Sequence, residues 1–393
     1  MKTHLPITIL SLILALAVSC EQSDEEPARG FVKFYGGYQA DAGNDVQVVP
    51  GGGYALTGVM NPDSVRRMFL LVTDARGNQL DFSPVFYGGN HETSGNSLLV
   101  LDDGYLLSGF LKDTLPGGEV KTDAYIVRTS KTGEEIWSRT YGGDGDDVAF
   151  HAVQRRSGGF VVAGAMDNPD QQDPWVFMID EEGNELGYEF KGNATGADDR
   201  ARFLLPAGEG YLCGATYDDG AYDGTDFYLI YLDEQCGVYD TRPMGTAYDD
   251  HTRCVFRYQD AFALMGYAEN LTSGVNELSV YTFGVDQNSI VDLERLATIS
   301  RSGRDLTGED CVVRDDGVIA VAGTFEENEN RDMMLLFLED GAESGRVTYG
   351  ELGNQSVHGI ARTPDGGLVM AGTNGLEGNS VISLVKTDAK GAL

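Results

Sequence analysis

A pattern of about fifty residues recurs seven times along the chain after residue 30. Three copies begin at an aromatic-Gly-Gly, whose first residues are Tyr35, Tyr87 and Tyr141, and four begin at worn versions of it, at Phe190, Met244, Ser300 and Tyr349. Each copy continues through a short apolar run, turns at a Gly/Asp pair and ends a second apolar run on glycine. A repeat of this length predicts stacked or radially arranged units of supersecondary structure. The closing glycines, 49 to 57 residues apart, are Gly58, Gly109, Gly164, Gly214, Gly266, Gly323 and Gly372.

Each repeat contains four segments that are typical of short strands. Gly-Gly and Asp-Gly pairs supply the positive φ that tight hairpin turns need. The apolar runs between them are rich in Val, Leu, Ile, Phe and Tyr, and a third and fourth strand follow, as at 123–130 and 135–143. Four antiparallel strands per repeat indicate a propeller blade, and no helical periodicity competes after residue 20. We therefore predict an all-β fold, a single seven-bladed β-propeller over residues 31–393.

The two ends of the repeat region predict how the ring closes. The seventh copy stops at 386–393, in the turn after a third strand, so its fourth strand is missing. The first copy is preceded by Phe31-Val32-Lys33-Phe34-Tyr35-Gly36-Gly37, which is a fourth strand without a blade. We predict that this N-terminal strand completes the C-terminal blade, because closure removes the exposed edges of the sheet.

Residues 1–19 have the features of a lipoprotein signal peptide. Lys2 precedes the apolar run Leu5–Val18, which is too short for a membrane span. The segment Leu16-Ala17-Val18-Ser19-Cys20 resembles a bacterial lipobox, although Ala17 stands where leucine is commonest. The resemblance implies cleavage before Cys20, lipidation of its thiol with palmitate-type chains, and attachment to the outer membrane. The alternative is an ordinary signal peptide with an incidental cysteine.

Residues 20–30 are predicted to form a lipidated flexible tether. Its acidic run, 21–26, resembles the surface-export signal of Bacteroidota lipoproteins, which implies that the protein faces the cell exterior. A generic solvated tether on a periplasm-facing protein is the alternative. The repeats themselves resemble the Tyr-Gly-Gly / Asp-Gly-Gly-Tyr propeller repeats of bacterial surface lipoproteins over essentially the whole mature chain. This second resemblance implies a fold and says little about function.

Charge and cysteine content exclude several classes of function. With 28 basic and 62 acidic residues the net charge is −34, so we expect no nucleic-acid partner. No Cys-x-x-Cys occurs, which argues against a zinc ribbon or a thioredoxin-like site. Cys254 and Cys311 occupy similar places in the inner strands of blades 5 and 6. We expect buried thiols there, because neighbouring inner strands diverge beyond the reach of a disulfide over most of their length.

No motif in the sequence selects a catalytic site. Gly-x-Ser-x-Gly, His-Glu-x-x-His and Walker sequences are absent, and 62 acidic residues offer no preferred glycosidase pair. Acidic loops such as 144–147 could hold Ca²⁺, but none matches an EF-hand, so we interpret them as solvated turns and predict no cofactor. His151, His251 and His358 lie near inner strands and could converge on a metal with Asp147 and Asp250. Packed or solvated imidazoles are the favoured interpretation, so no metal site is predicted.

Two tripeptides, Asp63-Ser64-Val65 and Asp113-Thr114-Leu115, look like the Asp-Ser/Thr-aliphatic O-glycosylation motif of exported Bacteroidota proteins. Ser64 and Thr114 are therefore predicted modification sites on exposed loops. The Asn193 and Asn270 sequons are interpreted as chance matches.

The sequence favours a non-catalytic binding or scaffold module. Its expected partners are the membrane, through the lipid anchor, and an outer-membrane β-barrel or other lipoproteins, as an accessory subunit of such a complex. The alternative is a surface glycan-binding protein or a polysaccharide-degrading enzyme, for which Tyr217, Tyr222 and Tyr239 are candidate stacking residues.

Overall fold

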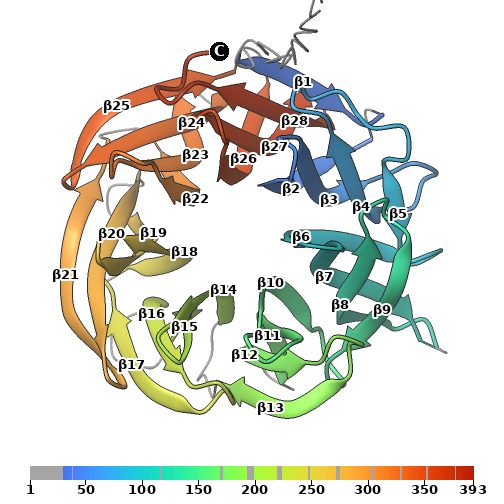
Figure 1. Cartoon of the computed structure of the whole chain (residues 1–393), viewed down its shortest axis with the longest axis horizontal. Coiled ribbons are helices and arrows are strands. Elements are labelled where there is room, and N and C mark those ends of the chain that lie inside the picture. The colour runs from blue at the N-terminus through green and yellow to red at the C-terminus, as the bar shows by residue number, and fades with distance from the viewer. Residues whose placement is uncertain are drawn as a thin grey trace, which may run out of the picture.

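The computed structural model describes residues 30–393 apart from 38, 116, 169–170, 193–198, 219–223, 247, 271–274, 302–304, 328–329, 351–352 and 377. In the described part, the strands form seven four-stranded antiparallel sheets arranged around a common axis (Figure 1). The predicted seven-bladed β-propeller is confirmed, and these residues contain no helix. It follows that no described helix could cross a membrane.

Six blades are continuous in sequence, and their strands run in chain order from the axis to the rim. Blades 1 to 3 comprise β2 (Ala42–Val48), β3 (Tyr54–Met60), β4 (Arg67–Thr73), β5 (Val85–Tyr87); β6 (Glu92–Leu101), β7 (Gly104–Thr114), β8 (Val120–Ser130), β9 (Glu135–Tyr141); β10 (Val148–Gln154), β11 (Phe160–Asn168), β12 (Gln171–Ile179) and β13 (Glu185–Lys191).

Blades 4 to 6 comprise β14 (Arg200–Ala207), β15 (Gly210–Tyr217), β16 (Asp226–Leu232), β17 (Val238–Met244); β18 (Asp249–Tyr258), β19 (Ala261–Asn270), β20 (Val275–Asp286), β21 (Ser289–Ile299); β22 (Leu306–Val313), β23 (Ile319–Glu327), β24 (Asn330–Glu339) and β25 (Ala342–Tyr349).

Blade 7 joins the two ends of the chain, as predicted. It contains β26 (Asn354–Arg362), β27 (Leu368–Leu376), β28 (Asn379–Thr387) and the N-terminal strand β1 (Phe31–Tyr35). β1 pairs antiparallel with β28, from Phe31 opposite Lys386 to Tyr35 opposite Ile382. Figure 1 shows the blue β1 lying along the red β28. Because of this pairing, β28 is not left as an unpaired edge, and blade 7 has four strands like the other six.

The apolar core lies between blades rather than within them. The middle strands are buried on both faces, and every residue of β3 and β16 is buried. One cluster joins blades 7 and 1 through Leu56, Phe69, Val369 and Leu384, each with no exposed surface. Each blade is therefore stabilised by its two neighbours, as expected for units that cannot bury both faces alone.

The tyrosine of the aromatic-Gly-Gly motif connects one blade to the next. Its phenolic hydroxyl donates a hydrogen bond to the carbonyl of a glycine in the turn between the third and fourth strands of the following blade, and the four glycines have φ between 72° and 84°. We call these contacts the tyrosine latches. They are Tyr35–Gly77 (2.7 Å), Tyr87–Gly133 (2.8 Å), Tyr141–Gly183 (2.7 Å) and Tyr349–Gly391 (2.6 Å).

The latches do not connect every pair of neighbouring blades. Three of the four worn copies of the motif begin with Phe190, Met244 and Ser300, which lack a phenolic hydroxyl, and only the fourth keeps its tyrosine, Tyr349. Between the described residues of blades 3 to 6 no such latch occurs. In blade 4 the turn glycine is also replaced, because Cys236 takes the left-handed position with φ 61°. At the junction between blades 3 and 4, both the tyrosine of the motif and the glycine whose carbonyl would accept its hydrogen bond are replaced.

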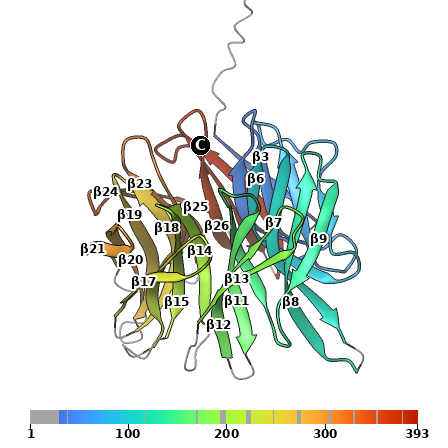
Figure 2. The same cartoon turned by 60° about the horizontal axis from the view of Figure 1, so that its bottom comes forward.

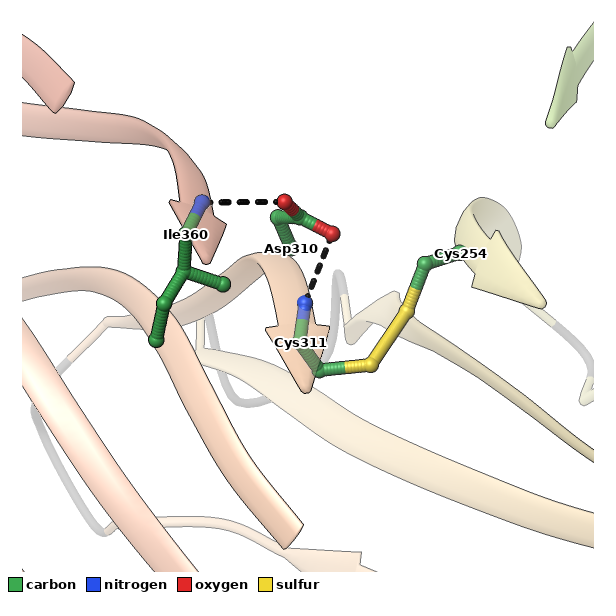
Figure 3. Close-up of a disulfide and its surroundings, with 4 residues drawn as sticks. All are labelled: Cys254, Asp310, Cys311 and Ile360. Atoms are coloured by element: carbon green, nitrogen blue, oxygen red, sulfur yellow. Dashed lines mark hydrogen bonds between the residues drawn. A yellow bond between two sulfur atoms is a disulfide. The ribbon is translucent and has the colours of Figure 1, made fainter. Parts of the chain in front are cut away.

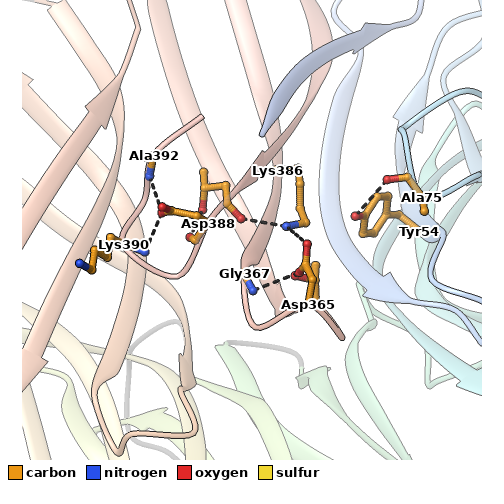
Figure 4. Close-up of polar contacts among 10 residues, drawn as sticks. Tyr54, Ala75, Asp365, Gly367, Lys386, Asp388, Lys390 and Ala392 are labelled. Carbon is orange, nitrogen blue, oxygen red and sulfur yellow. Dashed lines mark hydrogen bonds and ion pairs between the residues drawn. The ribbon is translucent and has the colours of Figure 1, made fainter. Parts of the chain in front are cut away.

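Blade 7 buries a lysine next to the closing strand. Lys386 is 2% exposed, and its Nζ donates to Asp365 Oδ2 at 2.9 Å and to the Thr387 carbonyl at 2.9 Å (Figure 4). A buried ammonium without a partner would cost several kcal/mol, so this pairing holds the β26–β27 turn against β28. Blade 2 repeats the arrangement with Arg128 and Asp103.

The two faces of the ring carry different connections. Strand direction places the turns between first and second and between third and fourth strands, such as 49–53 and 74–78, on one face. Phe31 lies on this face because it pairs with Lys386 near the end of β28. The C-terminus, which follows β28, is marked on the same side in Figure 2. We call the face that carries Phe31 and these turns the tether face. The opposite face, here called the distal face, carries the loops between second and third strands and between blades, such as 61–66.

Deletion of residues 31–37 should open the ring. About five inter-strand pairs would be lost, at roughly 1 kcal/mol per hydrogen bond, so unfolding should become easier by at least about 3 kcal/mol. Thermal melting and limited proteolysis of blade 7 measure this. Deletion of 21–26 is the control and should leave the melting temperature unchanged. Equal melting of the two variants would contradict closure by β1.

Candidate functional site in the central channel

A β-bulge interrupts the innermost strand of every blade at the same level. One residue per blade is inserted there without a partner on the second strand, a distortion that re-aims side chains. All seven inserted residues line a pocket on the propeller axis, and we call them the bulge ring. They are Asn44, Asn96, Phe150, Arg202, Arg253, Glu309 and His358.

The residue that follows the bulge connects neighbouring inner strands. Asp45 Oδ2 accepts a hydrogen bond from the Leu98 amide of the next blade at 2.8 Å. Asp310 Oδ2 accepts from the Ile360 amide at 3.0 Å, and His151 Nδ1 accepts from the Leu204 amide at 3.3 Å. In each case the residue that donates the amide hydrogen bond lies two positions after the bulge residue of its own strand.

Cys254 and Cys311 use this same position and form a disulfide between blades 5 and 6 (Figure 3). The expectation of two free thiols is therefore wrong. The two cysteines are not equivalent, since Cys254 is one residue after its bulge and Cys311 is two. This offset brings their Cα atoms to 6.8 Å, which is within bridging distance. Cys213 and Cys236 are buried free thiols.

Replacing both bridge cysteines by serine should lower stability by about 2–4 kcal/mol, because the bond closes a loop of 57 residues. Thermal melting with and without reductant measures the effect. Reductant should lower the melting temperature of the wild-type protein toward that of the C254S/C311S variant and leave the variant unchanged. Peptide mapping without reduction that finds both thiols free would contradict the bridge.

The pocket has a volume of about 580 Å³ and is lined mainly by polar groups. The arginines that line it are Arg202 on blade 4, Arg253 on blade 5 and Arg362 on blade 7, the last of which pairs with Asp315. Arg253 is paired, with Nη1 3.3 Å from Glu309 Oε2 and Nη2 donating to the Tyr267 hydroxyl at 2.8 Å. One side of the channel wall is therefore cationic. How strongly it attracts an anion depends on whether each arginine is already paired with a carboxylate.

Arg202 is the uncompensated charge. Its guanidinium carbon lies 4.6 Å from the centre of the Phe150 ring, and no carboxylate of the described residues pairs with it. Burial, followed by the positive charges of Arg253 and Arg200, lowers the pKa of Arg202 to about 9. The group is still charged at neutral pH, so the channel contains a cation without a counterion.

The acidic side of the pocket is on blades 1 and 6. Burial raises the pKa of Asp45 to about 6, against hydrogen bonds from the Leu98 and Val46 amides. Burial also raises the pKa of Asp310 to about 7, and repulsion from Asp45 and Glu309 adds to it. Both carboxylates receive backbone hydrogen bonds, so their main role is to hold inner strands together.

Asp310 should make stability fall as pH rises. Its pKa in the folded protein lies above the value near 4 of an unfolded chain, so the folded state binds the extra proton between about pH 4 and pH 7. This group's contribution is thus present below pH 4 and lost by about pH 7. The melting temperature of Asp310→Asn, relative to wild type, should therefore rise from pH 4 to pH 8.

Asp365→Asn is the control for that titration. Although burial opposes it, hydrogen bonds from Thr363 and Lys386 lower the pKa of Asp365. Its melting difference from wild type should be constant between pH 5 and pH 8. A flat difference for Asp310→Asn over the same range would contradict the raised pKa.

The three inner-strand histidines do not converge. His151 and His358 line the pocket, but His251 turns to Glu269, with Nε2 3.1 Å from Oε1. Burial lowers the pKa of His151 to about 4, so its ring is neutral. Within the residues that the structure describes, no three His, Cys, Asp or Glu side chains form a metal-binding group.

The acidic loops between blades use their carboxylates on the backbone. Asp147 accepts from the amides of Gly143 (2.6 Å) and Asp167 (2.9 Å), and Asp41 and Asp250 make the corresponding bond to the residue four positions before them. Burial raises the pKa of Asp250 to about 7. These side chains close turns, in agreement with the interpretation of the acidic loops as turn chemistry.

The other predicted residues lie away from the pocket. Ser64 and Thr114 are exposed on the distal face, on the loop after β3 and at the end of β7. Tyr217 and Tyr239 are at opposite ends of blade 4, so they do not form one stacking surface. Cys20, Tyr222 and the Asn193 sequon lie outside the described residues. No motif in the sequence marks Arg202, Arg253, Asn44 or Asn96.

No protein-family model and no curated protein matches the sequence. Among solved structures, the chain is similar to a luciferin-regenerating enzyme, at 9% identity and a TM-score of 0.47, covering 93% of this chain and 99% of that one. It is similar to the β-propeller domain of the Trilobed protease from Pyrococcus furiosus, at 10% identity and a TM-score of 0.47, covering 90% and 94%. A glucose dehydrogenase matches at 12% identity and a TM-score of 0.44, covering 91% and 99%. At such identities no activity transfers to this chain.

Proposed function

We propose that this protein is a lipid-anchored outer-membrane propeller that faces the cell exterior and acts as a non-catalytic binding module. The observation that carries the proposal is the position of Phe31 on the tether face. A chain anchored at Cys20 would join the ring on that face and leave the distal face turned away from the membrane. The Cys254–Cys311 disulfide supports export, because such bonds persist in oxidising compartments.

The distal face offers a surface for a protein partner. The β7–β8 hairpin has two strands of eleven residues each, longer than those of neighbouring blades, and its tip is on this face. Leu115 is 37% exposed and Val120 is 57% exposed beside the predicted glycosylation site Thr114. An outer-membrane barrel or a second lipoprotein is the partner that this arrangement suits, with apolar side chains as anchors.

Glycan binding at the channel is the second candidate function. The pocket combines an uncompensated arginine, the amides Asn44 and Asn96, and the rings of Phe150 and Phe203. Polar groups that fix orientation beside apolar surfaces are typical of small-molecule sites. This candidate does not require the partner surface on the distal face.

Lipidation is tested by labelling cells with a palmitate analogue. The wild-type protein should be labelled and should be cleaved by protease added to intact cells. Cys20→Ala should lose the label and leave the membrane fraction. Replacing the acidic residues of 21–26 by serine should keep the label and abolish cleavage by external protease. A labelled protein that stays resistant in the wild type would place it on the periplasmic side.

The partner surface is tested by cross-linking in native membranes, read by mass spectrometry. L115D/V120D should lose a cross-linked barrel or lipoprotein that the wild type captures. Val238→Asp is the control, because Val238 is 48% exposed on the outermost strand of another blade. Equal capture by all three proteins would contradict docking at the hairpin.

A further inference from the structure

We infer that the central channel binds a sugar acid, or a similar small hydroxylated carboxylate, through Arg202. The inference rests on the second candidate function, glycan binding at the channel, and makes its ligand specific; it does not depend on the lipidation of Cys20 or on the distal-face partner.

Arg202 lies in the channel, and no residue in the described part of the chain accepts a hydrogen bond from its guanidinium. The bulge turns the side chain into the channel, and the guanidinium lies over the Phe150 ring at 4.6 Å. Stacking occupies the flat face of the group, while its N–H donors point outward in the plane. This edge can receive both oxygens of a carboxylate in the paired geometry that arginine favours.

None of the channel carboxylates that the structure describes pairs directly with Arg202, although the negative charge of Glu309 attracts it from a distance. Glu309 pairs with Arg253 at 3.3 Å, and Asp45 and Asp310 accept amides of adjacent blades. In a protein with a net charge of −34, a cation without a counterion inside a pocket is unusual. Desolvating such a charge is costly, so an incoming anion would remove an existing penalty.

The size and the remaining lining of the pocket favour an organic monoanion over inorganic phosphate. A volume of about 580 Å³ is in the range of small-molecule sites, far larger than one ion requires. Asn44, Asn96 and Gln47 each donate one amide N–H within the protein, and the second N–H and the carbonyl oxygen of each can serve hydroxyl groups. Phe203 supplies apolar surface. The nearby carboxylates would repel a dianion more strongly than a single carboxylate.

The test measures binding by the full-length protein in detergent, using calorimetry and saturation-transfer NMR. The probes are D-galacturonate, D-glucuronate and N-acetylneuraminate, each compared with its methyl ester and, for the two uronates, with galactose and glucose. Inorganic phosphate is a further probe. At least one acid should bind, at least tenfold more tightly than its ester, its neutral sugar and phosphate.

Variants assign the site to Arg202. Arg202→Gln should weaken binding of that acid at least tenfold, and Arg202→Lys should have an intermediate effect because it keeps the charge without the planar fork. Arg66→Gln is the control, since Arg66 is half exposed on the distal-face loop before β4. Melting temperatures verify that each variant is folded.

Three results would overturn the inference. The first is that no acid binds more tightly than its ester or neutral sugar. The second is that phosphate binds as tightly as the best acid, which would indicate a simple anion site. The third is that folded Arg202→Gln retains wild-type affinity, which would place the acid elsewhere.

Discussion

The pairing of β1 with β28 is the interaction on which the rest of the molecule depends. It joins residues about 350 positions apart, yet the entropy of closing a loop grows only slowly with length, so this separation adds little cost. Phe34 and Val32 are 55% and 39% exposed, so β1 contributes mainly its backbone ladder and the Tyr35 latch. Closure sets the seven inner strands at fixed positions, and the channel exists only because they are fixed.

The junctions between blades are tied in two chemically different ways. Tyrosine latches tie blades 6, 7, 1, 2 and 3 at the rim, where a phenol reaches the carbonyl of a left-handed glycine. The disulfide ties blades 5 and 6 near the axis, where the described residues have no latch. A covalent bond at the inner strand restrains the same junction from its other end. The part of the ring without latches is therefore held together by a different kind of bond, and not merely by fewer bonds.

The fold could be predicted because turn residues and strand lengths are visible in the sequence. The channel site could not, because it depends on single-residue shifts of strand register. Turn glycines, strand length and the missing fourth strand are all visible in the sequence, so blade number and closure followed from them. A β-bulge has no such signature, because it adds one residue without changing the apolar pattern. The offset of Cys254 from Cys311 depends on that residue. So does Arg202, which emerges only when the repeats are aligned 12 to 14 residues before their closing glycines.

That alignment shows which blades carry a charged residue at the bulge. The backbone is the same in all seven blades, but the bulge residue changes from neutral amides in blades 1 and 2 to charged groups in blades 4, 5 and 6. The motif copies that precede these three blades, at Phe190, Met244 and Ser300, have lost their tyrosine, and the inner strands of blades 5 and 6 carry the disulfide. Holding Arg202 and Arg253 in adjacent blades brings like charges together, which opposes close packing of the inner strands. Glu309 partly neutralises Arg253 from blade 6, at the level where this repulsion arises. The disulfide holds blade 5 against blade 6 at that same level, whereas a tyrosine latch would act at the rim, at the far end of the blade.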